Sequence, residues 1–410
     1  MQNWIIAAAV GIALCDVSAQ SLAGGFAIGT QSGSGTGNAF SGGAASADDA
    51  STVWFNPAGM SYLPAGKNVA VTGHALKPSF KFSNIASNGA FAAPGTGEGG
   101  DAGDWTPVPQ AFFTTDLGRY LKLGLGLNVP FGLKTQYDAG WRGQFSSLKS
   151  EIKTINLNGA LSYRVSDRFS VGVGVSWQKL QAQLTSFSGP FAGVAKIKGD
   201  DNNWGMNIGV IFSPTPATRI GVHYRSSIGY KLTGNASFTV TPALNGGVSA
   251  DLTVPESFSL SFFSAVSPQW DLMGDVTWTR WSRVDRLNVV RTTGAVLNTL
   301  TLNWDNTTRV SIGMNYKPNP IWKFRFGVAY DPTPTNDRDR TARLPDEDRL
   351  WVAFGAQYRL SDASTLDVGY AHEFIRDASV NNTVAGVPGA LVGAFENKAD
   401  IVSVQFNHSF

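Results

Sequence analysis

The chain has 410 residues, with 43% hydrophobic side chains, 15% charged side chains and a formal net charge of +2. The charged fraction is well below the roughly 25% of soluble domains, and the near-neutral charge excludes a nucleic-acid partner, which requires a basic surface. The single cysteine, Cys15, lies in the segment described next, so the sequence predicts no disulfide and no thiolate metal site.

Residues 1–23 predict a secretory signal peptide. An apolar run from Trp4 to Leu14 is too short to span a bilayer, and small residues follow it. Cleavage after Ala19 and cleavage after Ala23 both fit, and the sequence leaves the two open. No later uncharged apolar stretch reaches the ~20 residues that a membrane helix needs. We therefore expect an exported chain without a membrane-spanning helix.

Residues 24–66 precede the first expected strand and show no sustained alternation of apolar and polar positions. They are rich in small residues and include Asp48, Asp49 and the triplet Asn56-Pro57-Ala58. The segment is too long for a free tail and too short for a separate domain, and its small residues allow close backbone packing. We expect it to plug the barrel described next, which divides the chain into 1–23, 24–66 and 67–410.

From Lys67 onward the sequence alternates with period two, as in strands that have two different faces. In "LKLGLGLNVPFGL" (121–133) every odd position is apolar, and we expect all of these side chains to face lipid. The other face carries Gly, Ser and single charged residues, such as Arg219, His223 and Arg225, which suits a crowded polar lumen. About fourteen strands are expected, at 67–82, 105–117, 120–133, 150–165, 168–188, 203–213, 218–234, 250–266, 269–286, 300–316, 322–331, 348–360, 364–376 and 399–410.

Short turns rich in Pro and Asp alternate with longer loops between these strands, which is typical of an outer-membrane barrel. The even strand count leaves no unpaired edge in lipid. The terminal Phe410 fits a signal for the barrel-assembly machinery. The sequence thus predicts an all-β fold, a 14-stranded antiparallel transmembrane β-barrel in the outer membrane of a Gram-negative cell. We expect a monomer in contact with outer-membrane lipid and lipopolysaccharide.

Several stretches resemble the FadL family of outer-membrane transporters for long-chain fatty acids and other hydrophobic compounds. The most specific are "GFAIGTQSGSGTGNAFSGGAASADDASTVWFNPAGM" (25–60) and "LPDEDRLW" (344–351), and the likeness extends over essentially the whole mature chain. The resemblance implies a barrel closed by an N-terminal hatch, no cofactor, and passive uptake of a small hydrophobic substrate. A general diffusion porin for small polar solutes is the alternative.

The resemblance also implies an opening in the barrel wall. In the family the third strand is kinked inward, and "NVPFGL" (128–133) matches that place. Pro130 lacks a donor for the strand ladder and Gly132 tolerates unusual dihedrals, so both weaken pairing; a simple bulge is the alternative. Asn56-Pro57-Ala58 matches the hatch motif that packs against the kinked strand, with an ordinary turn as the alternative.

Five residues are candidates for the substrate pocket. Phe26 matches the aromatic residue that helps line the internal ligand site in the family, and a packing role is the alternative. On the expected fifth strand the lumen face becomes apolar at Leu180, Ala182 and Leu184. Trp281 lies on the lumen face near the outer end of the ninth strand. Apolar side chains in a lumen meet the plug, a loop or an apolar ligand, so loop packing also stays open.

The sequence does not separate a fatty acid from a neutral hydrocarbon. The upper half of the fifth strand, 181–188, carries no Lys or Arg that could hold a carboxylate. The loop after this strand is short, so a surface docking groove would come from other loops, such as 236–249 and 287–300.

The charged run "DRDRTARLPDEDR" (337–349) is expected to be a solvated outer loop with local ion pairs. Contact with a divalent ion or lipopolysaccharide through Asp346, Asp348 and Arg349 is the alternative. The four histidines show no metal-ligand spacing and no nucleophile motif. We therefore expect neither an enzyme nor a metal site.

Overall fold

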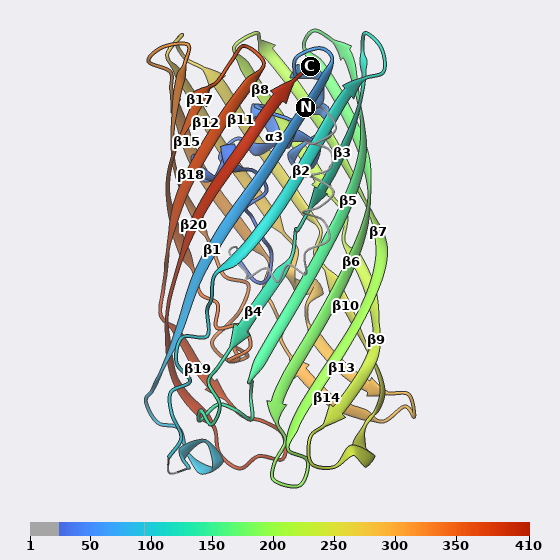
Figure 1. Cartoon of the computed structure of the whole chain (residues 1–410), viewed down its shortest axis with the longest axis vertical. Coiled ribbons are helices and arrows are strands. Elements are labelled where there is room, and N and C mark those ends of the chain that lie inside the picture. The colour runs from blue at the N-terminus through green and yellow to red at the C-terminus, as the bar shows by residue number, and fades with distance from the viewer. Residues whose placement is uncertain (1–23, 94) are drawn as a thin grey trace.

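The structure is a computed structural model that describes residues 24–93 and 95–410, so the expected signal peptide lies outside the described residues. One closed antiparallel barrel contains all strands, because β1 pairs with both β2 and β20 (Figure 1). The strands are β1 (Lys67–Asn84), β2 (Thr106–Asp116), β3 (Leu121–Asn128), β4 (Gly132–Gln136), β5 (Lys149–Ser166), β6 (Phe169–Phe187), β7 (Val194–Thr215), β8 (Thr218–Arg225), β9 (Ile228–Phe238), β10 (Gly246–Val254), β11 (Ser257–Ala265), β12 (Trp270–Thr279), β13 (Arg286–Arg291), β14 (Val296–Thr301), β15 (Thr307–Tyr316), β16 (Trp322–Asp331), β17 (Arg349–Arg359), β18 (Ser364–Ile375), β19 (Ala378–Asn382) and β20 (Leu391–Ser409).

Several spans of the barrel consist of two consecutive strands with a short break between them, as at β8 and β9 or at β10 and β11. Counted as spans, the described strands form a 14-stranded barrel, which confirms the predicted fold class. Closure gives every span two neighbours, as a β-structure in lipid requires.

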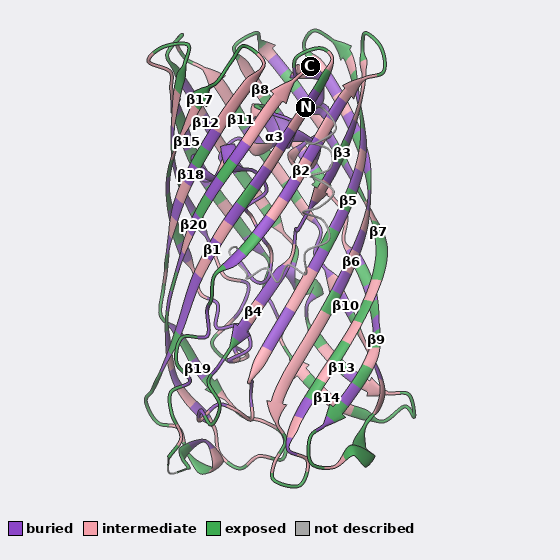
Figure 2. Ribbon diagram, in the orientation of Figure 1, coloured by how far each residue is buried: buried purple, intermediate pink, exposed green. Residues whose placement is uncertain are grey.

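The two faces of the strands differ as the alternation predicts. On β6, Ser170 and Ser176 point into the lumen and are 1% and 2% exposed, whereas Val173 and Val175 on the outer face are 52% and 53% exposed. Figure 2 shows the resulting alternation of buried and exposed residues along the strands. An apolar outer face and a small or polar inner face are what a barrel in a bilayer needs.

The segment 121–133 departs from its prediction at the outer end. β3 ends with Asn128 opposite Asn156 of β5, and β4 begins with Gly132 opposite Lys153. The three residues 129–131 therefore face only two residues of β5, so this strand contains one extra residue. Because side chains alternate with period two, the extra residue reverses the faces. Leu125 is exposed outside, but Val129 and Leu133 are buried inside, so the expectation that all these residues face lipid was wrong.

Residues 24–66, which we call the hatch, lie inside the barrel toward the end where the C-terminus lies (Figure 1). They contain α2 (Gly33–Thr36), α3 (Gly43–Ser46), α4 (Thr52–Phe55) and the 3-10 helix η1 (Pro57–Tyr62). Short 3-10 helices η2 (Gly89–Ala92), η3 (Pro242–Leu244) and η4 (Trp281–Arg283) occur elsewhere. None of the described helices is long and apolar enough to cross a membrane.

Small wall residues let the hatch approach the strands closely. A Cβ on Gly221 of β8 would lie 1.9 Å from the carbonyl oxygen of Ala44, and one on Gly209 of β7 would lie 1.9 Å from Oδ1 of Asn56. Both distances are far inside van der Waals contact, so only glycine fits at these two places.

Candidate functional site

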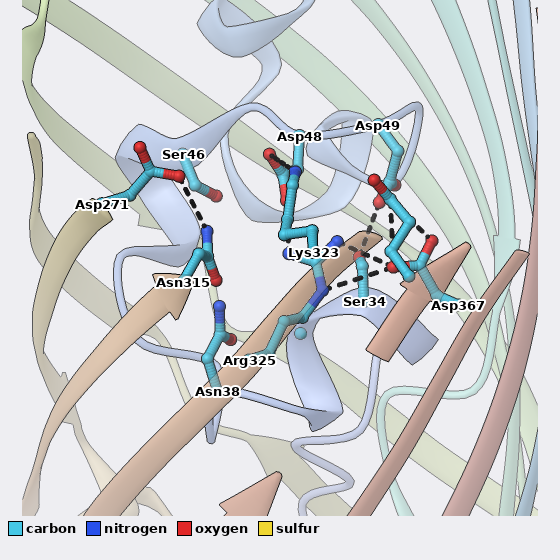
Figure 3. Close-up of polar contacts among 12 residues, drawn as sticks. Ser34, Asn38, Ser46, Asp48, Asp49, Asp271, Asn315, Lys323, Arg325 and Asp367 are labelled. Carbon is cyan, nitrogen blue, oxygen red and sulfur yellow. Dashed lines mark hydrogen bonds and ion pairs between the residues drawn. The ribbon is translucent and has the colours of Figure 1, made fainter. Parts of the chain in front are cut away.

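The middle of the hatch is held by ion pairs to the barrel wall. Asp48 lies 2.7 Å from Nη1 of Arg325 and 3.4 Å from Nζ of Lys323, both on β16 (Figure 3). Arg325 also pairs with Asp367 of β18 at 2.7 Å and is itself 1% exposed. Burial alone raises the pKa of Asp48, but Lys323 and Arg325 outweigh it and hold the pKa well below its ordinary value. Asp48 thus anchors the hatch as a carboxylate.

A second set of contacts joins the hatch to β20. Asp49 accepts a hydrogen bond from Ser34 at 2.6 Å within the hatch and one from the Gln405 side chain at 2.8 Å (Figure 3). Gln405 in turn accepts from the backbone N–H of Gly33 at 2.7 Å. Because these polar groups are buried, loss of any of these hydrogen bonds would leave a desolvated group without a partner. Together the bonds therefore hold α2 against the wall.

The motif Asn56-Pro57-Ala58 lies against β5 to β8. The Asn56 side chain donates to the carbonyl of Val210 on β7 at 3.1 Å and to that of Val222 on β8 at 3.2 Å. The carbonyl of Ala58 accepts from Ser162 on β5 and Ser170 on β6. Its hydrogen bonds thus go to β5–β8, and the 3-10 helix that begins at Pro57 also contacts β3, so packing of the motif against the kinked strand stays a prediction.

The barrel wall lacks strand pairing next to the break in β3. β2 pairs with β3 only from Ala111 to Asp116, its outer part Thr106–Gln110 pairs with β1 alone, and β4 pairs with β5 alone. We call the unpaired stretch between residues 106–110 and residues 129–136 the wall opening. Pro130 and Gly132 lie on its β4 side, as the sequence predicted for a break in pairing.

Two prolines mark the β2 side of the wall opening. Asp116 donates its N–H to Gly66 on the β1 side, and Leu117 donates to Leu121 on the β3 side. Backbone N–H groups alternate between the two sides of a strand, so the nitrogens of Pro107 and Pro109, like that of Leu117, point toward the wall opening. Since proline has no N–H, this edge offers no donor at either position.

The first residues of the hatch lie behind the wall opening and bond to both of its sides. The N–H of Ile28 donates to the carbonyl of Pro130 at 2.9 Å, and the N–H of Gly132 donates to the carbonyl of Phe26 at 2.9 Å. On the other side, the Gln110 side chain of β2 donates to the carbonyl of Thr30 at 2.6 Å. Residues 26–30 thus bridge the two edges that the strands leave unpaired.

An apolar cluster adjoins this segment. Phe26 is 3% exposed, and its ring centroid lies 5.1 Å from that of Trp281, 5.5 Å from that of Trp304 and 5.7 Å from that of Phe131. The cluster also contains Leu133, Leu180, Ile228, Tyr230, Leu232, Leu252, Val254, Val284 and Leu344, with Ala182 packed against it. Aromatic rings in such a group attract each other beyond the burial of their area.

The structure brings together four of the five predicted pocket residues. Phe26, Leu180 and Trp281 belong to the apolar cluster and Ala182 packs against it, whereas Leu184 is half-buried and lies outside it. Sequence reasoning missed Phe131, which it assigned to the lipid face. The sequence offered a bulge at 128–133 only as the alternative, and the extra residue in the break turns this part of the strand inward.

A cavity of about 200 Å³ lies between the hatch and the wall. Phe131, Trp281 and Pro130 line it on the side of the apolar cluster. Its polar lining comes mostly from the wall, with Gln31 added by the hatch, and includes His223 and Arg225 of β8, Asp275 of β12, Thr307 and Arg309 of β15 and Asp331 of β16. The volume is below the roughly 300 Å³ of ordinary ligand pockets, so a long substrate enters fully only when neighbouring residues move.

The charged segment 337–349 is exposed at Asp337 and Arg338 but folds inward from Arg340 on, which contradicts the expectation of a solvated loop for that part. Arg340, Asp346 and Arg349 are each at most 3% exposed. Arg349 pairs with Asp346 and, at 2.9 Å, with Glu373 of β18, and Asp346 accepts from the N–H of Gly25 at 2.8 Å. Opposite charges within the run neutralise each other, which allows it to be buried against the start of the hatch.

A second, larger cavity of about 800 Å³ opens among the outer loops. Phe187, Phe238 and residues 296–301 line it together with residues 381–387. Parts of the two segments considered for a docking groove, 236–249 and 287–300, therefore border it. Among the described residues, no three His, Cys, Asp or Glu side chains are placed to hold a metal ion.

Comparison with known proteins adds independent information. The chain is 26% identical to "Long-chain fatty acid transport protein" of Escherichia coli O6:H1 (strain CFT073), over 98% of each chain. A solved Pseudomonas aeruginosa FadL homologue matches with a TM-score of 0.87 and 26% identity, over 94% of this chain and 100% of that one. The Pseudomonas putida toluene transporter TodX shares the fold, with a TM-score of 0.68 and 17% identity, over 88% of this chain and 94% of that one.

The profile of one protein family covers nearly the whole sequence. It is described as "Outer membrane protein transport protein (OMPP1/FadL/TodX)" and matches residues 14–410. Together with the closed barrel, this match identifies an outer-membrane protein of Gram-negative type. The chain belongs to the OMPP1/FadL/TodX family, as its N-terminal hatch sequence and its "LPDEDRLW" stretch predicted.

Proposed function

We propose that this protein takes up hydrophobic compounds, with long-chain fatty acids as the first candidates, by passive diffusion through the wall opening. The substrate enters the outer cavity, moves to the apolar cluster around Phe26, Leu180, Ala182 and Trp281, and leaves past Pro130 and Gly132. Burial of an alkyl chain contributes roughly 0.8 kcal/mol per methylene, so transfer needs no energy source and no cofactor.

One observation carries this proposal: residues 26–30 hydrogen-bond both sides of the wall opening from inside the barrel, and Phe26 among them belongs to the apolar cluster. A ligand that competes for the place of Phe26 removes the segment from the wall opening. Substrate binding and opening of the wall are then one event, because Phe26 belongs both to the apolar cluster and to the segment that closes the wall opening.

The relatives support uptake of apolar substrates over a porin for polar solutes. Two relatives at 26% identity are named for long-chain fatty acid transport or as a FadL homologue, whereas the toluene transporter, at 17%, shows the shared fold alone. The hatch fills the lumen with buried side chains, which leaves less room than a water-filled porin has. The relatives are transport proteins, and we propose no enzymatic activity.

We also propose the contacts that the protein makes in its membrane. Phe410 is half exposed at the end of β20 and donates its N–H to Lys67 at 2.8 Å, so its ring is accessible to the barrel-assembly machinery. The apolar outer face contacts lipid and the outer loops contact lipopolysaccharide. Closure of the barrel within one chain supports a monomer.

The test removes the extra residue in the break. Deletion of Pro130 leaves two residues of this strand against two of β5, which restores a continuous ladder and points the next apolar residues outward again. Substitution Pro130→Ala keeps the extra residue and serves as the matched control. Cells that lack their own transporter express each variant, and uptake of labelled oleate and of a labelled alkylbenzene is measured.

We expect the deletion to abolish uptake and the Pro130→Ala variant to retain it, with both barrels folded by their heat-dependent mobility in gels. Equal uptake by the deletion variant and the parent contradicts the lateral route. Uptake of small sugars in place of both apolar compounds supports the porin.

A further inference from the structure

Lysines gather on the outward face of neighbouring strands near the outer end of the barrel. On β7, exposed Lys196 and Lys198 alternate with residues that line the outer cavity, so both point away from the lumen. On β9, exposed Lys231 lies between two residues of the apolar cluster and also points outward. On β6, Lys179 precedes Leu180 of the same cluster and shares this outward direction.

The strand register extends this surface to the strands beside the wall opening. Leu133 points inward, so Lys134 next to it on β4 points outward, and its partner in the ladder is Glu151 of β5. The lysines two residues to either side of Glu151 face outward with it. The outward face of β4, β5, β6, β7 and β9, which we call the lysine face, thus contains Lys134, Lys149, Lys153, Lys179, Lys196, Lys198 and Lys231.

The carboxylates on the lysine face do not balance its lysines. Glu151 pairs with Lys149 at 3.1 Å, and Asp200 pairs with Lys179 at 3.2 Å. Asp251 of β10 lies opposite Lys231 in the ladder, but no ion pair joins them. Among the described residues, no Asp or Glu oxygen lies within ion-pair distance of three of the lysines, namely Lys196, Lys198 and Lys231. The surface therefore has an excess of exposed positive charge.

Two tryptophans mark the border of the apolar band below the lysine face. Trp177 of β6 and Trp204 of β7 lie opposite each other in the ladder and face outward. On their periplasmic side the outward residues are apolar and exposed, as Val175 and Met206 are. Because tryptophan is enriched where a membrane meets water, the outer interface of the bilayer runs through this pair.

The lysines lie at different heights above this interface. Lys179 comes two residues after Trp177, whereas Lys198 and Lys196 come six and eight residues before Trp204 on the outer side. With a rise of about 3.3 Å per residue and a tilt of about 40°, the three lysines lie ~5, ~15 and ~20 Å above the tryptophans. A phospholipid carries its phosphate at one level, next to its acyl chains. Lipopolysaccharide carries phosphates on its lipid A sugars and, farther out, on its inner core sugars.

We propose that the lysine face binds the phosphate groups of lipopolysaccharide. Lys179 lies at the level of the lipid A phosphates, and Lys196 and Lys198 lie at the level of the core phosphates. A lysine ammonium on its flexible stem is suited to phosphate as a point charge. The inference rests on the proposed contact with lipopolysaccharide, which it moves from the outer loops to the strands, and it is independent of the uptake function.

The position of the lysine face also decides what the bound lipid adjoins. Lys134 lies on β4, which borders the wall opening, so acyl chains of the bound lipid lie next to the exit for an apolar substrate. Two residues that the sequence suggested for lipopolysaccharide, Asp346 and Arg349, are each 3% exposed and so are not available for this contact.

The test measures binding of lipid to the purified mature chain in detergent by native mass spectrometry. The probes are lipopolysaccharide with a phosphorylated inner core, the same lipopolysaccharide after removal of its phosphates, and dioleoylphosphatidylglycerol. The test variant combines three substitutions at exposed positions without ion pairs, namely Lys196→Gln, Lys198→Gln and Lys231→Gln. The control variant removes the same charge from exposed positions at the periplasmic end, namely Arg119→Gln, Arg168→Gln and Arg359→Gln.

We expect the lysine variant to bind phosphorylated lipopolysaccharide about tenfold or more weakly than the parent does. Each lysine near an anionic lipid surface contributes about fivefold in affinity before screening by salt. Binding of phosphatidylglycerol should fall by about fivefold at most, because the two lysines of β7 lie above its phosphate. The control variant should stay within about twofold of the parent for every probe, and the parent should bind the dephosphorylated form weakly.

Unchanged binding in the lysine variant overturns the proposal and leaves a contact through the outer loops standing. An equal loss for lipopolysaccharide and phosphatidylglycerol also overturns it, since the lysines then attract any anionic lipid. The same holds for an equal loss in the control variant, which would make net charge the cause. If the parent binds neither form of lipopolysaccharide, the proposed contact itself is refuted, and this inference with it.

Discussion

Replacement of Phe26 by Ala tests whether the start of the hatch is a separately moving part. The Phe26 ring is buried against Trp281, Trp304 and Phe131, and its backbone carbonyl accepts from Gly132 across the wall opening. The substitution removes the ring contacts, keeps the backbone hydrogen bond and does not touch the ion pairs of Asp48. We therefore expect residues 26–30 to open more often while the rest of the hatch stays in place.

The magnitude follows from burial. Truncation of a buried Phe to Ala costs about 3–5 kcal/mol, and we take the lower end because the adjacent cavity of about 200 Å³ lets neighbouring side chains relax. About 3 kcal/mol corresponds to roughly a hundredfold rise in the open population, since every 1.4 kcal/mol is a factor of ten. Phe26→Leu keeps most of the apolar volume and should change the population by only about fivefold.

Hydrogen–deuterium exchange measures this directly on the parent and both variants. The amides of Ile28 and Gly132 are the reporters, because their hydrogen bonds join the hatch to the β4 side of the wall opening. The peptide that contains Asp48 is the internal control. If its exchange accelerates as much as that of the reporters, the hatch moves as one body. If neither accelerates, Phe26 does not hold the segment. Either result refutes the reasoning.

Two further perturbations address the remainder of the hatch. Because the pKa of Asp48 lies below its ordinary value of 3.8, its ion pairs contribute fully above about pH 4 and are lost as the pH falls through the folded-state value. Hydrogen exchange in the Asp48 peptide, corrected for its intrinsic pH dependence, should therefore not change between pH 7 and pH 5. Asp48→Asn should accelerate this exchange at both pH values by roughly tenfold or more. A Cβ on Gly172 would lie 2.4 Å from the N of Ala58, so Gly172→Val should displace Asn56-Pro57-Ala58 and raise single-channel conductance. Gly159→Val is the control and should not raise it, because a Cβ there would meet only Cδ2 of Leu125, at an ordinary contact distance of 3.9 Å. Unchanged conductance in Gly172→Val would mean that the motif tolerates displacement.

Most of the barrel could be predicted from the sequence because period-two alternation records which face of a strand meets lipid. The alternation fails where both faces meet water or loops, and there the predicted boundaries were short: β7 begins at Val194, not at residue 203, and β20 begins at Leu391, not at residue 399. These outer ends pair as regular ladders through backbone hydrogen bonds, which carry no side-chain signature.

The candidate site was predictable in part. Leu180, Ala182 and Trp281 stood out as apolar side chains on a polar face, and the structure gathers them with Phe26. Two features of the site could not be predicted from the sequence. A single extra residue at 129–131 reverses which side chains face inward. Ion pairs between charges that are distant along the chain, such as Arg349 and Glu373, bury a segment whose composition predicts exposure to solvent. Neither depends on local sequence, because each is set by partners far away along the chain.

The prolines on β2 have a consequence for how the barrel coexists with its neighbours. A strand edge with free N–H groups in hydrocarbon carries an energy of several kcal/mol for each unmet donor and invites another chain to add a strand. At Pro107 and Pro109 those donors do not exist, so the stretch can stay unpaired without a desolvated N–H at either position. Crowded outer membranes bring barrels side by side, and an edge of this kind gives a neighbouring barrel no template for β-augmentation or strand exchange.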